Sequence, residues 1–339
     1  MTMSSTNNSS TFAARVSAIW RRRDAVVLII LLLFVVIGLA GLAAATGWQE
    51  VSEQLAKLSL FQFAALLGLS VINYAFRSLR WHLFATNLGL GTGLVQNARH
   101  FLGGFAMSVT PGRIGELVRM RWIRRETEWS FEKTAPLVLV DRASDLAAMA
   151  VILGLAVSFS ATGINGALPV TFLALLTAVI ATRPQMLAAT AGIGYRLFGR
   201  WPRLFARVRS ASRSLAQFSS PGTIGLACAI GAIGWFAEGY AFHLLLMWMG
   251  IDIGLAKAMA IFIFATLAGG LTGAPGGVGG AEAAMIALLS LEGVPLNVSV
   301  PATAIIRVTT LWFAIAIGIA VFPLAEKYSL KGRDALEKI

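Results

Sequence analysis

The chain has 339 residues, of which 57% are hydrophobic and only 13% are charged, whereas soluble domains average about 25% charged residues. This composition excludes an ordinary soluble globular protein, and the single cysteine, Cys228, excludes an internal disulfide and a cysteine-rich metal site. The net charge of +12 could suggest nucleic-acid binding, but in a membrane protein basic segments on the cytoplasmic side are the commoner cause.

The apolar runs, taken in chain order, predict an all-α, polytopic helical membrane protein. Residues 1–24 begin with a Ser/Thr/Asn-rich stretch and are expected to form a disordered cytoplasmic N-terminus. Residues 25–45 form a charge-free run that is too long for a secretory signal, so it predicts an uncleaved first helix. Full spans are predicted near residues 25–46, 60–82, 134–158, 166–182, 222–249 and 298–323.

Two further segments, residues 97–125 and 256–291, have a different pattern. Each consists of two short apolar pieces separated by a Pro-Gly sequence, and neither piece reaches the roughly 20 residues that a full crossing needs. These lengths predict two re-entrant or broken-helix hairpins. Whether each hairpin is re-entrant or crosses the membrane fully is left open.

The distribution of Lys and Arg predicts the orientation of the chain. The N-terminus, residues 183–213 and the C-terminal tail are basic, whereas the loops at 47–59 and 250–257 are not. Because cytoplasmic loops carry the excess of Lys and Arg, both termini are expected to be cytoplasmic, in a plasma (inner) membrane. We expect one transmembrane domain over residues 25–325, followed by a cytoplasmic tail over 326–339.

The basic linker, residues 183–217, contains an amphipathic pattern at 195–217. Its arginines recur on one helical stripe, and apolar residues lie on another. This pattern is typical of an interfacial helix, which would contact anionic lipid headgroups through residues 195–213. The alternative is a basic cytoplasmic loop without membrane contact.

The two halves of the chain resemble each other. The sequence TPGRIGE around Pro111 matches GAPGGVGGAE around Pro275, and these prolines are 164 residues apart. Tyr74 and Tyr240 are 166 apart in the similar sequences NYAFR and GYAFH, and Arg142 and Arg307 are 165 apart. The nearly constant offset predicts a duplication, with repeat 1 at about 60–182 and repeat 2 at about 222–323. The charge distribution gives the two repeats opposite orientations, an arrangement found in many transporters.

The Pro-Gly breaks are expected to line the binding site. Proline lacks an N–H group and consecutive glycines do not maintain a helix, so backbone groups are left unpaired there. Such a break is tolerated at membrane depth only inside the protein or beside a wet cavity, and the helix that begins after it attracts an anion. Close helix packing by small residues is the alternative explanation. The predicted break residues are Pro111, Gly112, Pro275, Gly276 and Gly277.

Several ionisable residues lie within the predicted apolar segments, where a charge must be paired or must face a cavity. Arg142 and Arg307 are the candidates for binding a phosphate headgroup, because a guanidinium group matches phosphate with paired hydrogen bonds. Asp141, Arg142 and Asp145 could instead form a local ion-paired set, and Arg307 requires a distant carboxylate or a ligand. Arg77 and Arg80 are interpreted as interface anchors at a helix end. The predicted substrate-binding residues are Arg113, Glu116, Asp141, Arg142, Glu238, Glu282 and Arg307.

The sequences TPGRIGE, LVDRASD and GAPGGVGGAE together resemble the lysylphosphatidylglycerol synthase transmembrane region family, which is also described as flippase-like. The resemblance covers roughly residues 25–325 and implies a membrane domain that moves lipids between leaflets. It also implies that Arg113, Glu116, Asp141, Arg142, Glu282 and Arg307 belong to the site. No soluble aminoacyl-transferase domain follows residue 325, which argues against lipid synthesis by this chain.

The leading hypothesis is therefore a transporter of an anionic phospholipid or related lipid, without enzymatic activity, cofactor or metal. One alternative is a membrane-embedded enzyme acting on a lipid phosphate, although no metal-ligand cluster or nucleophile–base arrangement is evident in the sequence. Another is a non-transporting partner of lipid-synthesis enzymes for hopanoids or aminoacyl lipids. The lipid, the energy source and the oligomeric state do not follow from the sequence.

Overall fold

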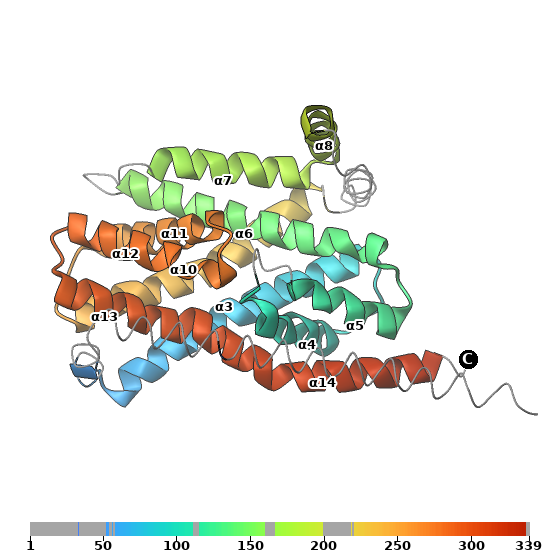
Figure 1. The fold of residues 1–339 in the computed structure, drawn as a ribbon, viewed down its shortest axis with the longest axis horizontal. Helices are drawn as coiled ribbons and strands as arrows, with labels where there is room; N and C mark the ends of the chain where they lie inside the picture. Colours follow the sequence, from blue (N-terminus) through green and yellow to red (C-terminus); the bar gives the residue numbers. More distant parts are fainter. Residues whose placement is uncertain are drawn as a thin grey trace, which may run out of the picture. The chain divides into compact units, whose positions relative to one another are not determined.

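The computed structural model describes residues 58–110, 115–159, 167–198 and 220–336, with the single residues Leu33, Ser52, Glu53, Ala56 and Phe218. The chain divides into two units, Met1–Ala45 and Thr46–Ile339, and everything below concerns the second. The described residues form helices and connecting turns, without a strand, which confirms the all-α prediction (Figure 1). The predicted first span at 25–46, the break residues Pro111, Gly112 and Arg113, and most of the basic segment 195–217 lie outside the described residues.

Two long antiparallel helices, α3 (Leu60–Asn87) and α10 (Pro221–Trp248), form the centre of the described unit. Each has 28 residues and is therefore about 42 Å long, enough to cross a bilayer. Their direction follows from contacts along their length: Asn87 donates a hydrogen bond to Thr223 near the start of α10, whereas Asn73 packs against Gly234 further along α10.

Each central helix leads into a hairpin of two short helices. After α3 come α4 (Leu94–Gly104), a 3-10 turn at Phe105–Met107 and α5 (Val118–Thr127). After α10 come α11 (Leu255–Leu271), a 3-10 turn at Pro275–Gly277 and α12 (Gly280–Leu291). Because α3 and α10 are antiparallel, the two hairpins start at opposite ends of the bundle (Figure 1).

The hairpins differ in one respect from the sequence prediction. Both pieces of each broken segment were expected to be apolar, but α5 has the sequence VRMRWIRRET and carries four arginines. One of these, Arg119, is fully buried, while Arg121 and Arg125 form ion pairs with Glu326. The duplication itself stays a prediction.

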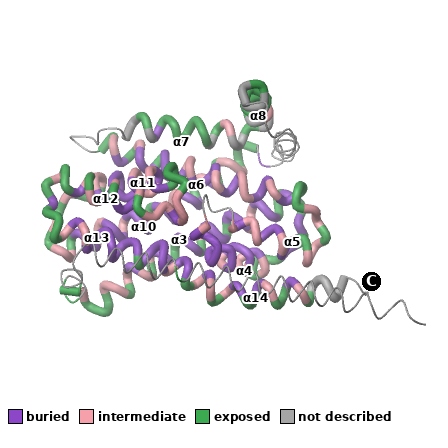
Figure 2. Tube along the Cα trace, viewed as in Figure 1, coloured by how far each residue is buried: buried purple, intermediate pink, exposed green. Residues whose placement is uncertain are grey.

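The remaining helices cover this core. Helix α6 (Phe131–Phe159) crosses it, and α7 (Ala167–Thr182) packs on α6 and leads to α8 (Pro184–Phe198). The last crossing consists of α13 (Leu296–Arg307), a π-helical segment at Val308–Trp312 and α14 (Phe313–Leu336). Figure 2 shows α7 largely exposed, whereas the helices below it mix buried and exposed residues. By length and composition, the helical stretches Leu60–Asn87, Pro221–Trp248 and Leu296–Lys331 could each cross a membrane.

Buried apolar side chains form two clusters, one around each hairpin. The cluster around α11 and α12 includes Phe242, Phe262 and Met285. The cluster around α4 and α5 includes Trp81, Phe101 and Ile123, and α14 contributes to it. Charged side chains lie between these clusters, and they form the candidate site.

Gly318 allows α14 to contact the tip of the first hairpin. A Cβ atom built at Gly318 would lie 2.6 Å from the carbonyl carbon of Phe105 and would also overlap the backbone nitrogen of Ala106. Both obstacles are backbone atoms, so they cannot move aside as a flexible side chain would. The α14–hairpin contact therefore requires glycine at this position.

We predict that Gly318→Ala lowers the free energy of unfolding by about 1–3 kcal/mol, the typical cost of overpacking a well-packed interior. Gly225→Ala is the matched control, because nothing lies within 4 Å of a Cβ built at that exposed position of α10. Its effect should stay within about 1 kcal/mol, the helix-propensity difference between glycine and alanine. Thermal unfolding of the purified full chain in detergent measures both, and equal midpoints for the two variants would contradict the close approach.

Candidate functional site

Four charged side chains connect α3 to α6 in the middle of the bundle. Arg80 lies 2.7 Å from Asp141 and 2.6 Å from Asp145, and Arg77 lies 2.7 Å from the other oxygen of Asp145. All four side chains are at most 5% exposed. The interpretation of Arg77 and Arg80 as interface anchors is therefore wrong: they are internal ion-pair partners, because Asp141 and Asp145 on α6 lie directly opposite them.

Glu116 connects the first hairpin to this network. Its carboxylate accepts a hydrogen bond from Ser108 Oγ at 2.8 Å and one from Arg142 Nη2 at 2.5 Å. Arg142 also lies 3.5 Å from Asp141 and 3.6 Å from Asp145. Arg142 is thus shared among three carboxylates, and its side chain is 28% exposed whereas that of Glu116 is only 2% exposed.

The second hairpin contains a similar pair. Arg307 Nε donates to Glu282 Oε1 at 2.5 Å, and Arg307 Nη2 donates to the carbonyl oxygen of Gly276 at 3.0 Å. The other oxygen of Glu282 accepts a hydrogen bond at 2.6 Å from the N–H of Gly279, the residue that precedes α12. Glu282 is thus the distant carboxylate that the sequence required for Arg307, and it is also the anion at the start of α12.

The glycines at the second break allow the backbone conformation that is found there. Gly276 and Gly277 have φ values of 62° and 70°, in the left-handed region that favours glycine. A Cβ at Gly277 would also lie 3.1 Å from the backbone of Gly269 on α11. Close packing, the alternative reading of the glycines, therefore accounts for Gly277, while Arg307 satisfies the carbonyl of Gly276.

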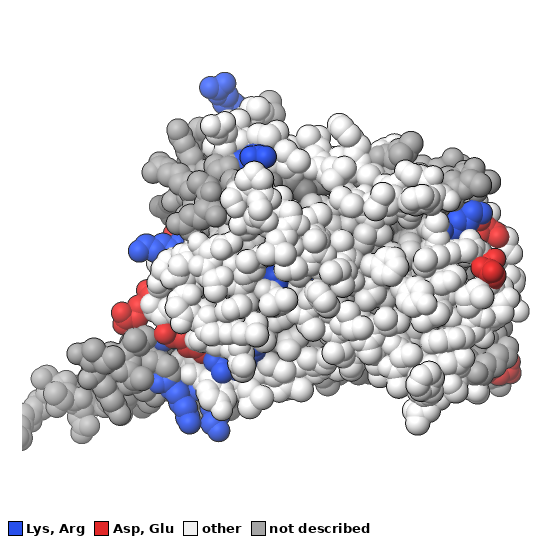
Figure 3. Space-filling view, turned by 180° about the vertical axis from the view of Figure 1, so that it is seen from behind, with Lys and Arg blue, Asp and Glu red and all other residues white. Residues whose placement is uncertain are grey.

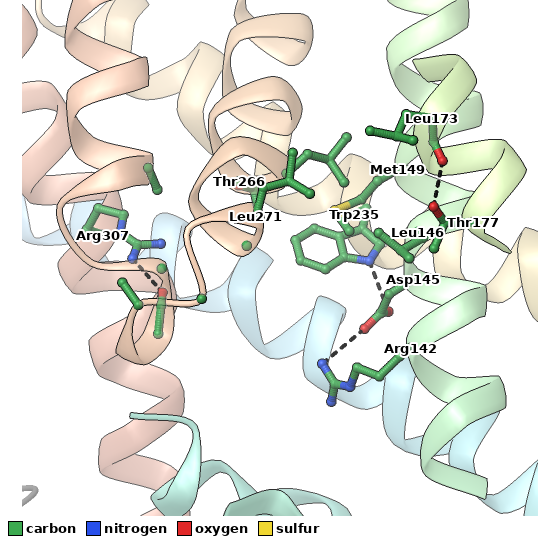
Figure 4. A pocket seen from close by; sticks show the side chains of 17 residues that line it. Arg142, Asp145, Leu146, Met149, Leu173, Thr177, Trp235, Thr266, Leu271 and Arg307 are labelled. Carbon is green, nitrogen blue, oxygen red and sulfur yellow. Dashed lines mark hydrogen bonds and ion pairs between the residues drawn. The ribbon is translucent and has the colours of Figure 1, made fainter. Parts of the chain in front are cut away.

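A cavity of about 340 Å³ lies between these two charged groups. Figure 4 shows Arg307 and the second break on one side, and Arg142, Asp145 and Trp235 on the other. Trp235 Nε1 donates to Asp145 at 3.1 Å. Apolar side chains, including Leu146, Met149, Leu173 and Leu271, complete the wall, to which α6, α7, α10, α11, α12 and α13 all contribute.

The predicted site residues are only partly brought together. Arg142, Arg307, Gly276 and Gly277 line the cavity, and Glu116 and Glu282 are the direct partners of the two arginines. Asp141 is buried behind Arg142, and Glu238 is buried on α10 without lining the cavity. In the described part of the chain, no group of three His, Cys, Asp or Glu side chains is placed to hold a metal ion.

Besides Arg77 and Arg80, two further residues, Trp235 and Arg119, were not predicted from the sequence as part of the site. In the sequence, Trp235 is one apolar residue among many in its span. The available signal was the preceding Gly234, which packs against α3 and so marks the inward-facing side of α10. Arg119 looked like one of several basic residues near the cytoplasmic end of the first hairpin. The sequence signal for an Arg119–Glu116 contact was the spacing of three residues, because residues three apart lie on the same side of a helical turn.

Comparison with known proteins gives a consistent result over most of the chain. The family described as "Lysylphosphatidylglycerol synthase TM region" matches residues 25–318. A "UPF0104 membrane protein" of Methanothermobacter thermautotrophicus is 28% identical over 316 aligned positions, covering 85% of this chain and 94% of that protein. Another "UPF0104 membrane protein" of the same organism is 30% identical over 111 positions, covering 33% of this chain and 32% of that protein.

We predict that Glu282→Gln lowers the free energy of unfolding by about 3–5 kcal/mol, because it leaves Arg307 as a buried charge without its carboxylate. Glu292→Gln is the matched control, since Glu292 forms an equally short ion pair with Lys257, at 2.5 Å, but at a more exposed position. Its cost should be at most about 1 kcal/mol. Denaturation in detergent compares the two variants, and equal losses would show that the Arg307–Glu282 pair does not stabilise the second hairpin.

Proposed function

Because the chain belongs to the lysylphosphatidylglycerol synthase TM region family, we propose that it moves an anionic lipid between the leaflets of its membrane. The headgroup would occupy the cavity between Arg142 and Arg307. The chain would act as a transporter and not as an enzyme. The observation that carries the proposal is the position of these two arginines on either side of one cavity.

The chemistry of the cavity favours a phosphate group. A guanidinium offers several N–H donors in a plane, which match phosphate oxygens better than a single ammonium group does. A volume of about 340 Å³ is at the lower end of the range of ligand sites. The cavity would therefore accommodate a headgroup, while the acyl chains remain outside it.

The edge of the cavity favours a lipid over a soluble solute. Leu173 on α7 and Leu271 at the end of α11 line the cavity and are 48% and 69% exposed. Exposed leucines at the rim of an internal cavity suit contact with acyl chains. A lipid could then keep its chains in the bilayer while its headgroup lies between the arginines.

The two hairpins provide a route to both sides. Since they enter from opposite ends of the bundle, movement of one hairpin would open the cavity to one leaflet and movement of the other to the opposite leaflet. Transporters built from inverted repeats with broken helices work around a central site in this way. The predicted inverted duplication would explain why Glu116 and Glu282, 166 residues apart, each pair with an arginine of a following helix.

The charge distribution favours one orientation in the membrane. In Figure 3, charged side chains gather at the two ends of the molecule, and the band between them is almost free of charge. One end carries Arg99, Arg121 and Arg125, held by Glu126 and Glu326. The other has the Lys257–Glu292 pair. The Arg-rich end would lie on the cytoplasmic side of a plasma (inner) membrane.

Two further expectations from the sequence also stay proposals. These are the contact of residues 195–213 with anionic headgroups and the association with lipid-synthesis enzymes.

We predict that Arg142→Gln slows translocation at least about tenfold, because a hydrogen bond to a charged group contributes about 1.5–3 kcal/mol. The assay uses phosphatidylcholine vesicles that contain the purified protein and a trace of chain-labelled phosphatidylglycerol, extracted from the outer leaflet by albumin. Lys133→Gln is the control, since Lys133 is a cation near Trp129 that does not line the cavity. Mass spectrometry of the lipids distinguishes transport from chemistry.

Three results would contradict the proposal. If wild type translocates the lipid no faster than protein-free vesicles do, transport of this lipid class is excluded. If Arg142→Gln and wild type have equal rates, the cavity is not the site of the activity. A chemically changed phosphatidylglycerol would instead favour a membrane-embedded enzyme.

A further inference from the structure

The last crossing contains a wide helical turn directly after the cavity residue Arg307. Helix α13 ends at Arg307, residues Val308–Trp312 form a π-helix, and α14 begins at Phe313. It is the only π-helical segment among the described residues. Such segments occur mostly as single turns inside α-helices and frequently at functional sites. This turn separates the part of the crossing that carries the cavity arginine from the part that packs on the first hairpin.

A tyrosine of the central helix α3 bonds this turn from outside. The hydroxyl group of Tyr74 donates a hydrogen bond at 2.5 Å to the carbonyl oxygen of Thr310, in the middle of the turn. Tyr74 is buried, and its ring packs against Phe105 and Phe313, with ring centres 5.3 Å and 6.1 Å away. These contacts hold the ring on two sides and so fix the direction of the hydroxyl group.

The other side-chain bonds to this part of the backbone are local. Thr310 Oγ1 donates to the carbonyl of Ile306 at 2.6 Å, and Thr309 Oγ1 donates to that of Ile305 at 3.1 Å. Threonine makes such bonds in ordinary helices as well, so they do not select a π turn by themselves. Within the described residues, Tyr74 is the only side chain of another helix that bonds a backbone group of this turn. A side chain inserted into the helical hydrogen-bond ladder is a known cause of helix distortion.

The turn also fixes where Arg307 meets the second break. Arg307 Nη2 bonds the carbonyl oxygen of Gly276, and Leu311 lies against the same glycine, since a Cβ atom built at Gly276 would be 3.2 Å from Leu311 Cδ2. Gly276 is thus contacted by the residue before the turn and by one residue within it. A change in the width of the turn moves Leu311 relative to Arg307, so both contacts are kept only while the turn keeps its shape.

We propose that Tyr74 is a positioning residue for the headgroup site: by bonding the carbonyl of Thr310, it keeps the π-helical turn open and holds Arg307 toward the cavity. The inference rests on the proposed function. A buried tyrosine hydroxyl usually finds some partner, but here the partner is the backbone of the turn that adjoins a cavity arginine. Because Arg77 of the same helix pairs with Asp145 on the other side of the cavity, α3 positions groups on both sides.

The test measures translocation of chain-labelled phosphatidylglycerol in the vesicle assay above, over a series of phosphatidylglycerol fractions. Tyr74→Phe keeps the ring and its packing but removes the hydroxyl group, so one hydrogen bond is lost. We expect the half-saturating fraction to rise about two- to tenfold, the range that corresponds to one hydrogen bond. The maximal rate per folded protein should stay unchanged, because a saturating headgroup orients Arg307 itself. A general loss of structure would instead lower the maximal rate and leave the half-saturating fraction unchanged.

Tyr240→Phe is the matched control. Tyr240 is the counterpart of Tyr74 in the predicted duplication and lies on the other central helix, α10. Its ring stacks on Phe236, with ring centres 6.0 Å apart, and it does not line the cavity. Within the described residues, its hydroxyl group forms no hydrogen bond. Removal of this hydroxyl group should leave the half-saturating fraction and the maximal rate at their wild-type values.

A second comparison asks whether Tyr74 acts through Arg307. Arg307→Lys keeps a positive charge beside Glu282 but lacks the planar group that the turn would orient. Tyr74→Phe should therefore raise the half-saturating fraction in wild type and not in the Arg307→Lys protein. Equal increases in both would show that the two residues act independently. Size-exclusion profiles identify variants that do not fold, and if Arg307→Lys is one of them, the comparison of Tyr74→Phe with Tyr240→Phe decides.

The outcomes separate this inference from the proposed function. If wild type transports and Tyr74→Phe has the wild-type half-saturating fraction, or if Tyr240→Phe changes it equally, the role of Tyr74 is refuted while the proposed function stands. A Tyr74→Phe protein that does not fold would show a structural role and refute the inference as well.

If wild type does not transport, the proposed function fails, and thermal unfolding of the same proteins in detergent tests the coupling alone. An equal loss of midpoint on Tyr74→Phe in wild type and in Arg307→Lys refutes the coupling. A smaller loss in Arg307→Lys supports it.

Discussion

The structure depends on pairing between arginine and carboxylate side chains at membrane depth. An unpaired charge there is costly, so each charged residue of one helix requires a partner on another. Arg77 and Arg80 on α3 are satisfied by Asp141 and Asp145 on α6, and this fixes the two helices against each other in register. Apolar packing alone specifies register weakly between helices surrounded by lipid, because the lipid chains are as apolar as the helix surfaces.

The same constraint applies at the breaks in the hairpins. A helix that is interrupted at membrane depth leaves backbone groups unpaired at the break, and these must be satisfied within the protein. At the second break, Arg307 bonds the carbonyl of Gly276, and Glu282 bonds the N–H of Gly279. The Arg307–Glu282 pair therefore neutralises both charges. It also satisfies one backbone carbonyl and one backbone N–H group at the break. This explains why the carboxylate and the arginine occur together with the glycines, rather than either one alone.

Much of the fold could be predicted from the sequence, because the apolar runs and the Pro-Gly breaks are local signals. The spans at 60–82, 134–158, 166–182, 222–249 and 298–323 correspond to helices, and the second break lies at Pro275–Gly277. The partners of the charges could be predicted less well. Arg77 and Arg80 were misassigned because pairing with Asp141 and Asp145 spans more than 60 residues, and no local pattern encodes it. Arg119 was overlooked because its neighbours in sequence are exposed or half-buried arginines, and only the tertiary structure shows which of them is buried.

Charge balance also explains how the site could select an anion. Around the cavity and its ion pairs, the described residues include five arginines and five carboxylates: Arg77, Arg80, Arg119, Arg142 and Arg307, and Glu116, Asp141, Asp145, Glu238 and Glu282. With equal numbers, attraction of a phosphate cannot come from surplus charge among these residues. Under the proposed function it would come instead from guanidinium N–H donors at the cavity, which match phosphate oxygens in a plane. For such recognition a planar, five-donor guanidinium is better suited than the single ammonium group of lysine.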